Sequence, residues 1–171
     1  GQLGPAEIPA KRDWTYRHVQ WLGHSLGVPL AMPAAHPFNP LPLLRLALAC
    51  STPDAPGQVN RYVAELVLRH VWEGGADAVA PERVAALHAT LADHMAQRGR
   101  ELADPNADAV KQQLRANTEE ALAAGAFGVP SFVVDDKLFW GLDGLPMLKA
   151  CVQGDAWFDD PGWDSAASVQ V

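Results

Sequence analysis

Three residues of this 171-residue chain stand where their types could bind a small charged ligand. Pro130 precedes a β-favouring run, and a proline is tolerated at the mouth of a strand because no ladder hydrogen bond is lost there. Asp143 precedes a predicted helix, whose N-terminus attracts anions, and it is also a candidate N-cap. Lys11 stands at the start of another predicted helix, where a ligand carboxylate would offset the unfavourable helix dipole. The plainer alternatives are a structural cap at Asp143 and a solvated lysine at Lys11.

Other kinds of chemistry find little support in the residue pattern. The six histidines show neither H-E-x-x-H nor Cys/His ligand spacing, so no metal site is predicted. His36 lies in a proline-rich loop, where packing or capping explains it. Neither a G-x-S-x-G motif nor a phosphate-binding loop occurs. Cys50 and Cys151 are far apart and are predicted to be buried, unpaired thiols without a redox role, as in a reducing compartment.

Composition and charge limit the classes of function. A chain that is 49% hydrophobic can bury the core of one domain, or of one domain with a large insertion. Thirteen basic against twenty acidic residues give a net charge of −7, which argues against binding to nucleic acid or to an anionic membrane. No apolar run approaches the roughly 18–20 residues of a membrane span. The chain starts at Gly1 without a secretory signal pattern, and we expect a cytoplasmic protein.

The elements that must position these residues follow from periodicity and turn chemistry. Asp135-Asp136 fits a two-residue hairpin turn, Gly125 suits the left-handed position after a helix, and the tail 155–171 is expected to pack on the body. Asn39-Pro40 is expected to start a helix, and the first helix is expected to be buried on more than one side. The predicted helices are Lys11–Leu26, Leu43–Cys50, Gln58–Glu73, Pro81–Gln97, Asp104–Gly125 and Leu145–Val152, and the predicted strands are Ser131–Val134 and Lys137–Trp140.

The string Gly-Val-Pro-Ser-Phe, followed by the hairpin and by Phe-Trp-Gly-Leu-Asp, resembles the C-terminal half of a thioredoxin-type domain. It is most similar to the 2-hydroxychromene-2-carboxylate isomerases and the related kappa-class glutathione transferases, with DsbA-like thiol oxidoreductases as more distant relatives. The resemblance implies an α/β, thioredoxin-like fold with a large all-helical insertion, in which the N-terminal βαβ unit is missing from this chain. With this resemblance we predict a cis peptide bond between Val129 and Pro130.

The resemblance also implies a division of the chain into four parts. These are a loop at 1–10, a helical insertion domain at 11–124, the C-terminal half of the thioredoxin-like domain at 125–154, and a tail at 155–171.

The implied function is a glutathione-dependent isomerase of naphthalene-type aromatic catabolism. It would interconvert 2-hydroxychromene-2-carboxylate and trans-o-hydroxybenzylidenepyruvate by thiolate addition, bond rotation and elimination. The serine that acts on the thiol in this family lies in the missing part, so the catalytic residues are unknown apart from Lys11. The residues implied to bind glutathione are Gln2, where Asn is more usual, and Lys11, Val129, Pro130, Trp140, Leu142 and Asp143.

Three other readings stay open. A kappa-type transferase or peroxidase would use the same thiolate on an electrophile or a peroxide. A DsbA-like oxidoreductase would need a C-x-x-C motif at the start of the first helix of the fold, which the resemblance places in the missing N-terminal part. A non-catalytic thioredoxin-fold binding module is the third. The expected partners are a small aromatic carboxylate and a second copy of the chain, with neither nucleic acid nor membrane.

Overall fold

The computed structural model describes residues 7–166 and 168. The chain forms two compact units, unit 1 at Gly1–Leu114 and unit 2 at Arg115–Val171. The boundary falls inside helix α5, Asp108–Ala123. The four-part division given above remains a prediction.

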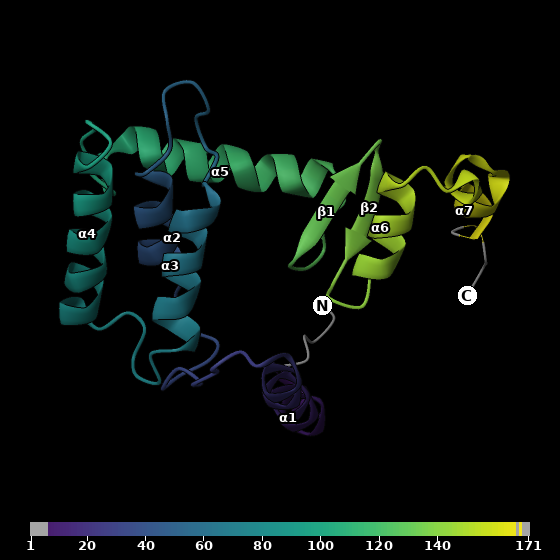
Figure 1. Cartoon of the computed structure of the whole chain (residues 1–171), viewed down its shortest axis with the longest axis horizontal. Coiled ribbons are helices and arrows are strands. Elements are labelled where there is room, and N and C mark those ends of the chain that lie inside the picture. Colours follow the sequence, from purple (N-terminus) through teal and green to yellow (C-terminus); the bar gives the residue numbers. More distant parts are fainter. Residues whose placement is uncertain (1–6, 167, 169–171) are drawn as a thin grey trace. The chain divides into compact units, whose positions relative to one another are not determined.

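Unit 1 is built from helices. Helix α2 (Leu41–Leu48) has the sequence Leu-Pro-Leu-Leu-Arg-Leu-Ala-Leu, and its nearly continuous apolar surface explains why it packs against both α3 and α4. These helices lie side by side in Figure 1. The helices of unit 1, besides the first part of α5, are α1 (Pro9–Leu26), α2, α3 (Arg61–Trp72) and α4 (Pro81–Ala96). The buried residues of the main core come from α2, α3 and α4 and from the segments next to them: Leu43, Leu46, Ala47, Cys50, Val63, Val71, Ala78, Leu87, Leu91 and Met95.

The helices of unit 1 are confirmed, but several of them start at other residues than predicted. Asn39 accepts a hydrogen bond from the Leu41 N–H at 3.1 Å, so α2 begins two residues before the predicted Leu43 and ends before Cys50. Asn60 caps α3 by accepting from the Val63 N–H at 3.0 Å, which moves the start from Gln58 to Arg61. In each case a local side-chain bond decides the first helical residue.

Helix α5 is shorter at both ends than the predicted helix Asp104–Gly125. Asp104 accepts from the Asn106 N–H at 2.8 Å and forms a turn, so the helix begins at Asp108. It ends at Ala123, and Gly125 takes the predicted left-handed conformation at φ 82°. Gly27 likewise ends α1 as predicted, at φ 67°.

Helix α1 is not buried on more than one side, and that prediction was wrong. Trp14, Trp21 and Leu26 are 68%, 60% and 64% exposed, and Gly23 is the buried residue of the helix, against Leu30. The apolar residues of α1 are interspersed with charged ones and form no stripe that a neighbour could cover.

Unit 2 contains the predicted hairpin, residue for residue. Strands β1 (Ser131–Val134) and β2 (Lys137–Trp140) are antiparallel, with Ser131 opposite Trp140 and Val134 opposite Lys137. Asp135 and Asp136 have φ values of 47° and 61°, the conformation of a tight two-residue turn. Helix α6 (Leu145–Val152) packs against β2, as Figure 1 shows.

The segment after α6 supplies the buried face that a two-stranded sheet cannot make alone. It folds as the short 3-10 helix η2 (Ala156–Asp159) and helix α7 (Pro161–Ala166). Phe139 of β2 is 1% exposed and packs edge-on against Phe158 at 5.9 Å between ring centroids. Trp163 approaches the same ring at 5.5 Å. The prediction that the tail packs on the body is confirmed within unit 2.

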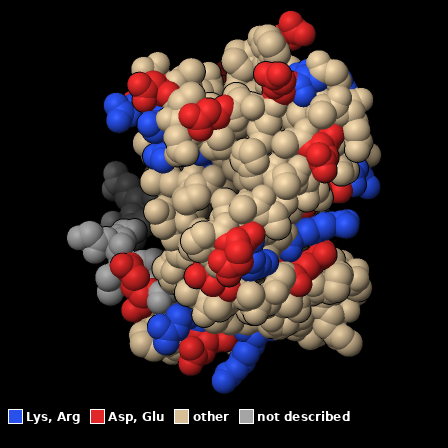
Figure 2. Space-filling view, turned by 90° about the vertical axis from the view of Figure 1, so that its left-hand side faces the viewer, with Lys and Arg blue, Asp and Glu red and all other residues tan. Residues whose placement is uncertain are grey.

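The surface carries charges of both signs. On the face shown in Figure 2, Lys and Arg are interspersed with Asp and Glu and do not gather into a basic patch. Among the described residues no helix is both long enough and apolar enough to cross a membrane.

One histidine is part of the core of unit 1. His94 is 5% exposed and stacks on Tyr62 with ring centroids 4.0 Å apart. Arg98 donates to its Nδ1 at 2.9 Å, which requires that this nitrogen carries no proton. Burial, and to a smaller degree the charge of Arg98, lower the pKa of His94.

This arrangement predicts a loss of stability on mild acidification. The pKa of His94 is lower in the folded state than the value of about 6.5 in the unfolded chain. Neutral His94 therefore contributes to the free energy of unfolding above about pH 6.5. This contribution is lost as the pH falls toward the pKa of the folded state, because the unfolded chain binds the proton more readily. Urea unfolding at pH 7.5 and 5.5 should show this decrease in wild type and a smaller one in His94→Gln. The matched variant His88→Gln, which changes an exposed histidine of the same helix, should behave as wild type. An equal decrease in His94→Gln would contradict the assignment.

Candidate functional site

The candidate site lies where the two strands of unit 2 meet their flanking loops. We call residues 127–130 the proline loop and residues 140–144 the acidic turn. The Val129-Pro130 peptide bond is cis, as predicted. The Gly141 N–H donates to the Pro130 carbonyl at 3.0 Å, and this bond joins the proline loop to the acidic turn.

Val129 presents its backbone to solvent. The residue is 90% exposed, and neither its N–H nor its carbonyl forms a hydrogen bond with any described residue. An extended ligand can satisfy such a pair of backbone groups by adding itself as a short strand. The structure therefore leaves at Val129 the free groups on which the sequence-based hypothesis relies.

Aromatic side chains form one wall of the proline loop. The Trp140 indole lies against Gly128, where a Cβ would stand 2.4 Å from its Nε1, and Ser131 fixes the loop by donating to the Gly128 carbonyl at 2.6 Å. Trp140 is 47% exposed, which favours a wall over a buried core role. Phe127 packs on Trp140 at 5.2 Å and is 72% exposed. Sequence reasoning did not assign Phe127, although it stands two residues before Val129.

Asp143 is not the N-cap of α6, so that prediction was wrong. The N-cap is Gly144, and no side chain of a described residue caps the helix. The Asp143 carboxylate instead folds back over Gly141, with Oδ1 2.6 Å from the position of a Cβ there, and Gly141 has a φ of 83° that suits glycine. Asp143 is exposed and forms neither a hydrogen bond nor an ion pair with another described residue. Its carboxylate is therefore available to a cationic group of a ligand.

The donors near α6 come from the turn more than from the helix itself. Pro146 has no N–H, and the Leu145 N–H already donates to the Leu142 carbonyl at 3.3 Å. The backbone N–H groups of Asp143 and Gly144 donate to no described atom. These two groups, next to a helix N-terminus, can bind an anion.

The structure brings most of the predicted site residues together. The proline loop and the acidic turn hold Val129, Pro130, Trp140, Leu142 and Asp143 within unit 2. Lys11 is exposed in the first turn of α1 in unit 1 and forms no ion pair with a described residue. Gln2 lies outside the described residues.

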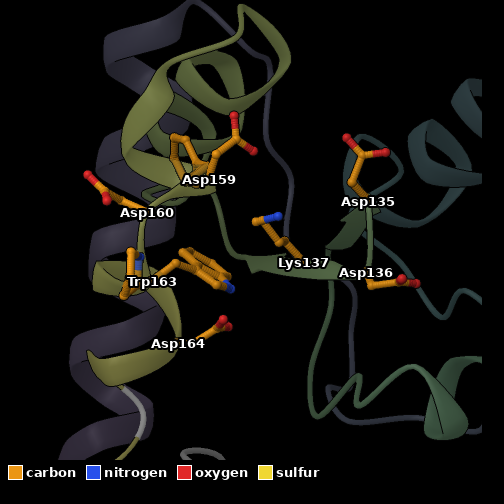
Figure 3. Close-up of a pocket in the computed structure, with 9 residues that line it drawn as sticks. Asp135, Asp136, Lys137, Asp159, Asp160, Trp163 and Asp164 are labelled. Carbon is orange, nitrogen blue, oxygen red and sulfur yellow. The ribbon is translucent and has the colours of Figure 1, made fainter.

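A second hollow of unit 2 is strongly acidic. A cavity of about 540 Å³ lies between the hairpin turn and the segment after α6, and Figure 3 shows carboxylates around Lys137 and Trp163. Within the described ranges no three His, Cys, Asp or Glu side chains form a group that could hold a metal ion. The negative charge of this cavity disfavours a ligand with two carboxylates, such as glutathione. The acidic residues that line it are Asp135, Asp136, Asp159, Asp160 and Asp164.

Cys50 is not placed as an activated nucleophile in this structure. Both cysteines are free thiols. Burial raises the pKa of the Cys50 thiol to about 11, against a smaller opposing effect of Arg100, so Cys50 stays protonated at neutral pH. Cys151 is only partly buried, which corrects the prediction of two buried thiols.

Comparison with known proteins gives consistent relatives. The chain is 26% identical over 157 residues to 2-hydroxychromene-2-carboxylate isomerase of Pseudomonas sp. (strain C18), covering 90% of this chain and 69% of that protein. It is 25% identical over 155 residues to the protein of the same name from Pseudomonas putida, covering 89% and 71%.

The fold comparison agrees. A solved structure of a 2-hydroxychromene-2-carboxylate isomerase matches with a TM-score of 0.71 at 19% identity, over 92% of this chain and 73% of the other. The fold is thus thioredoxin-like of the DsbA type, here mostly helical with a small two-stranded sheet. The family model of the DSBA-like thioredoxin domain matches residues 1–153, and the chain therefore belongs to that family.

Proposed function

We propose that this protein is a glutathione-dependent isomerase that interconverts 2-hydroxychromene-2-carboxylate and trans-o-hydroxybenzylidenepyruvate. The observation that carries the proposal is that no described residue pairs with the backbone of Val129 or with the carboxylate of Asp143, which lie in two loops joined by the Gly141–Pro130 hydrogen bond. The names of the two relatives at about 25% identity support the reaction.

Glutathione is a tripeptide with an ammonium and a carboxylate at one end, a cysteinyl residue in the middle and a second carboxylate. The free N–H and carbonyl of Val129 suit the cysteinyl backbone. The Asp143 carboxylate suits the γ-glutamyl ammonium, and the N–H groups of Asp143 and Gly144 suit the carboxylate next to it. Trp140 and Leu142, both about half exposed, would flank the ligand.

Bound glutathione would supply a thiolate whose reversible addition to a conjugated enone allows the former double bond to rotate. The residues of this chain then have the tasks of binding and orientation. Val129 and Asp143 hold the tripeptide at two points, which fixes the direction of its thiol. Lys11 provides a cation for a carboxylate of glutathione or of the substrate. The residue that ionises the thiol is not assigned.

The decisive experiment follows the isomerisation by ultraviolet absorbance with glutathione, with S-methylglutathione and without either. S-methylglutathione keeps every group that the protein would recognise but has no free thiol. Of the three samples, we expect conversion only in the one that contains glutathione. Equal rates in all three samples would refute a thiol-dependent mechanism. Turnover of an aryl halide or a peroxide in place of the chromene would identify a kappa-type transferase instead.

Asp143→Asn should weaken glutathione binding about fivefold. The change removes the charge but keeps the size, and a hydrogen bond to a charged group contributes roughly 1 kcal/mol more than a neutral one. Since Asp143 caps no helix, the melting temperature of the Asp143→Asn variant should match that of wild type.

Asp136→Asn is the matched control, because it removes an exposed carboxylate from the hairpin turn of the same unit, and Asn also tolerates its φ of 61°. Titration calorimetry with glutathione and a thermal melt separate the two effects. Unchanged affinity in Asp143→Asn would remove this residue from the site.

Lys11→Met should raise the dissociation constant of glutathione, or the KM of the substrate, by about twofold to fivefold. An exposed ion pair contributes about 0.2–1 kcal/mol, and the loss of a cation from a helix N-terminus costs no stability. Arg17→Met, which removes another exposed cation of α1, is the control. If both variants weaken binding equally, the effect reflects net charge and Lys11 has no specific role.

A further inference from the structure

Unit 1 contains a cavity that the proposed function does not use. It measures about 370 Å³ and lies between the loop 36–40 and helices α2 and α3. This volume falls within the roughly 300–1,000 Å³ typical of small-molecule sites. The side chains that characterise its wall are His36, Phe38, Leu44, Val67, Leu68 and Trp72. No described residue that lines it carries a formal charge at neutral pH with histidine neutral.

His36 is held in this wall by aromatic neighbours. Its ring centroid lies 5.4 Å from that of Trp72, 6.3 Å from that of Phe38 and 5.8 Å from that of Tyr16. The Phe38 and Tyr16 rings meet it edge-on, at interplanar angles of 67° and 71°. Contacts on several sides fix the orientation of the imidazole.

The hydrogen bonds of Tyr16 define which nitrogen of His36 carries the proton. The Tyr16 hydroxyl lies 2.9 Å from the His36 carbonyl and 3.1 Å from its Nδ1. A hydroxyl has one proton, and a carbonyl can only accept, so that proton goes to the carbonyl. Nδ1 must then carry a hydrogen and donate it to the Tyr16 oxygen. Nε2 is left with a lone pair and without a partner among the described residues.

The chemistry of the cavity restricts its occupant. A wall of apolar and aromatic side chains favours the burial of a planar, apolar ring system. The absence of a Lys or Arg in the wall makes a buried carboxylate costly. His36 lines the cavity, and its Nε2, an acceptor without a partner among the described residues, can take one hydrogen bond from a hydroxyl donor. We propose that this cavity binds a neutral planar aromatic alcohol whose hydroxyl donates to Nε2 of His36.

This inference goes beyond the proposed function and does not depend on it. Neither glutathione nor a reactive enone takes part, so the site can be tested without either. Failure of the isomerase assay would leave it standing, and the reverse also holds.

The experiment compares 1-naphthol with 1-methoxynaphthalene by titration calorimetry on the intact protein without glutathione. The two probes share a ring system, but the ether cannot donate. We expect 1-naphthol to bind roughly threefold to tenfold more tightly, the effect of one hydrogen bond. His36→Phe keeps an aromatic ring and removes the acceptor, so it should bind both probes equally.

Leu68→Lys tests the location. Leu68 is 56% exposed at the cavity wall, so the substitution should be tolerated while it removes apolar contact and weakens both probes at least threefold. Leu122→Lys, which changes a leucine of unit 2 that is 67% exposed, should leave both affinities unchanged. Equal affinity of wild type for the two probes, no binding of 1-naphthol, or unchanged binding in Leu68→Lys would each overturn the proposal. If His36→Phe does not fold, the comparison of the two probe affinities in wild type still tests the proposal.

Discussion

The hydrogen bond from the Gly141 N–H to the Pro130 carbonyl is the interaction on which the candidate site depends. It joins two loops that are separate in sequence and holds the residue next to Val129, whose own backbone is exposed and pairs with no other described backbone group. The tight conformation of the acidic turn supports this bond. Gly144 approaches the Trp140 carbonyl so closely that a Cβ would lie 2.6 Å from that oxygen, and a larger residue would force the turn apart.

The hairpin that carries these loops is small and needs support from elsewhere in unit 2. Phe139 of β2 packs against Phe158 and Trp163, and α6 packs against β2. The side chains at the site remain exposed, in contrast to this aromatic core. Rigid backbone with free polar groups and exposed aromatic rings suits a ligand that is recognised mainly through its peptide-like main chain.

Much of the architecture could be predicted because its signals are local. The Asp135-Asp136 turn and the glycines after α1 and α5 depend on backbone preferences that a few residues display, and the strands were placed without error. Helix starts were less accurate, since Asn39, Asn60 and Asp104 compete for nearby N–H groups in ways that periodicity does not show. The role of Asp143 was misjudged because the turn 140–144 closes tightly, with Gly144 against the Trp140 carbonyl, so that Gly144 and not Asp143 is the residue before the helix. Phe127 and the surroundings of His36 were missed because their ring contacts, to Trp140 and to Trp72, join residues that are distant in sequence. The cis bond between His36 and Pro37 was not predicted either.

Strand β1 has one partner, β2, so its other edge is unpaired in the described part of unit 2. An unpaired edge is a template on which chains can aggregate, and proteins limit this with short strands, proline and charge. All of these features occur here, since β1 has four residues, Pro130 precedes it and Asp135 follows it. Pro130 therefore separates the exposed edge of β1 from the free backbone of Val129, and a substitution of Pro130 that let the strand continue would lengthen the edge open to aggregation.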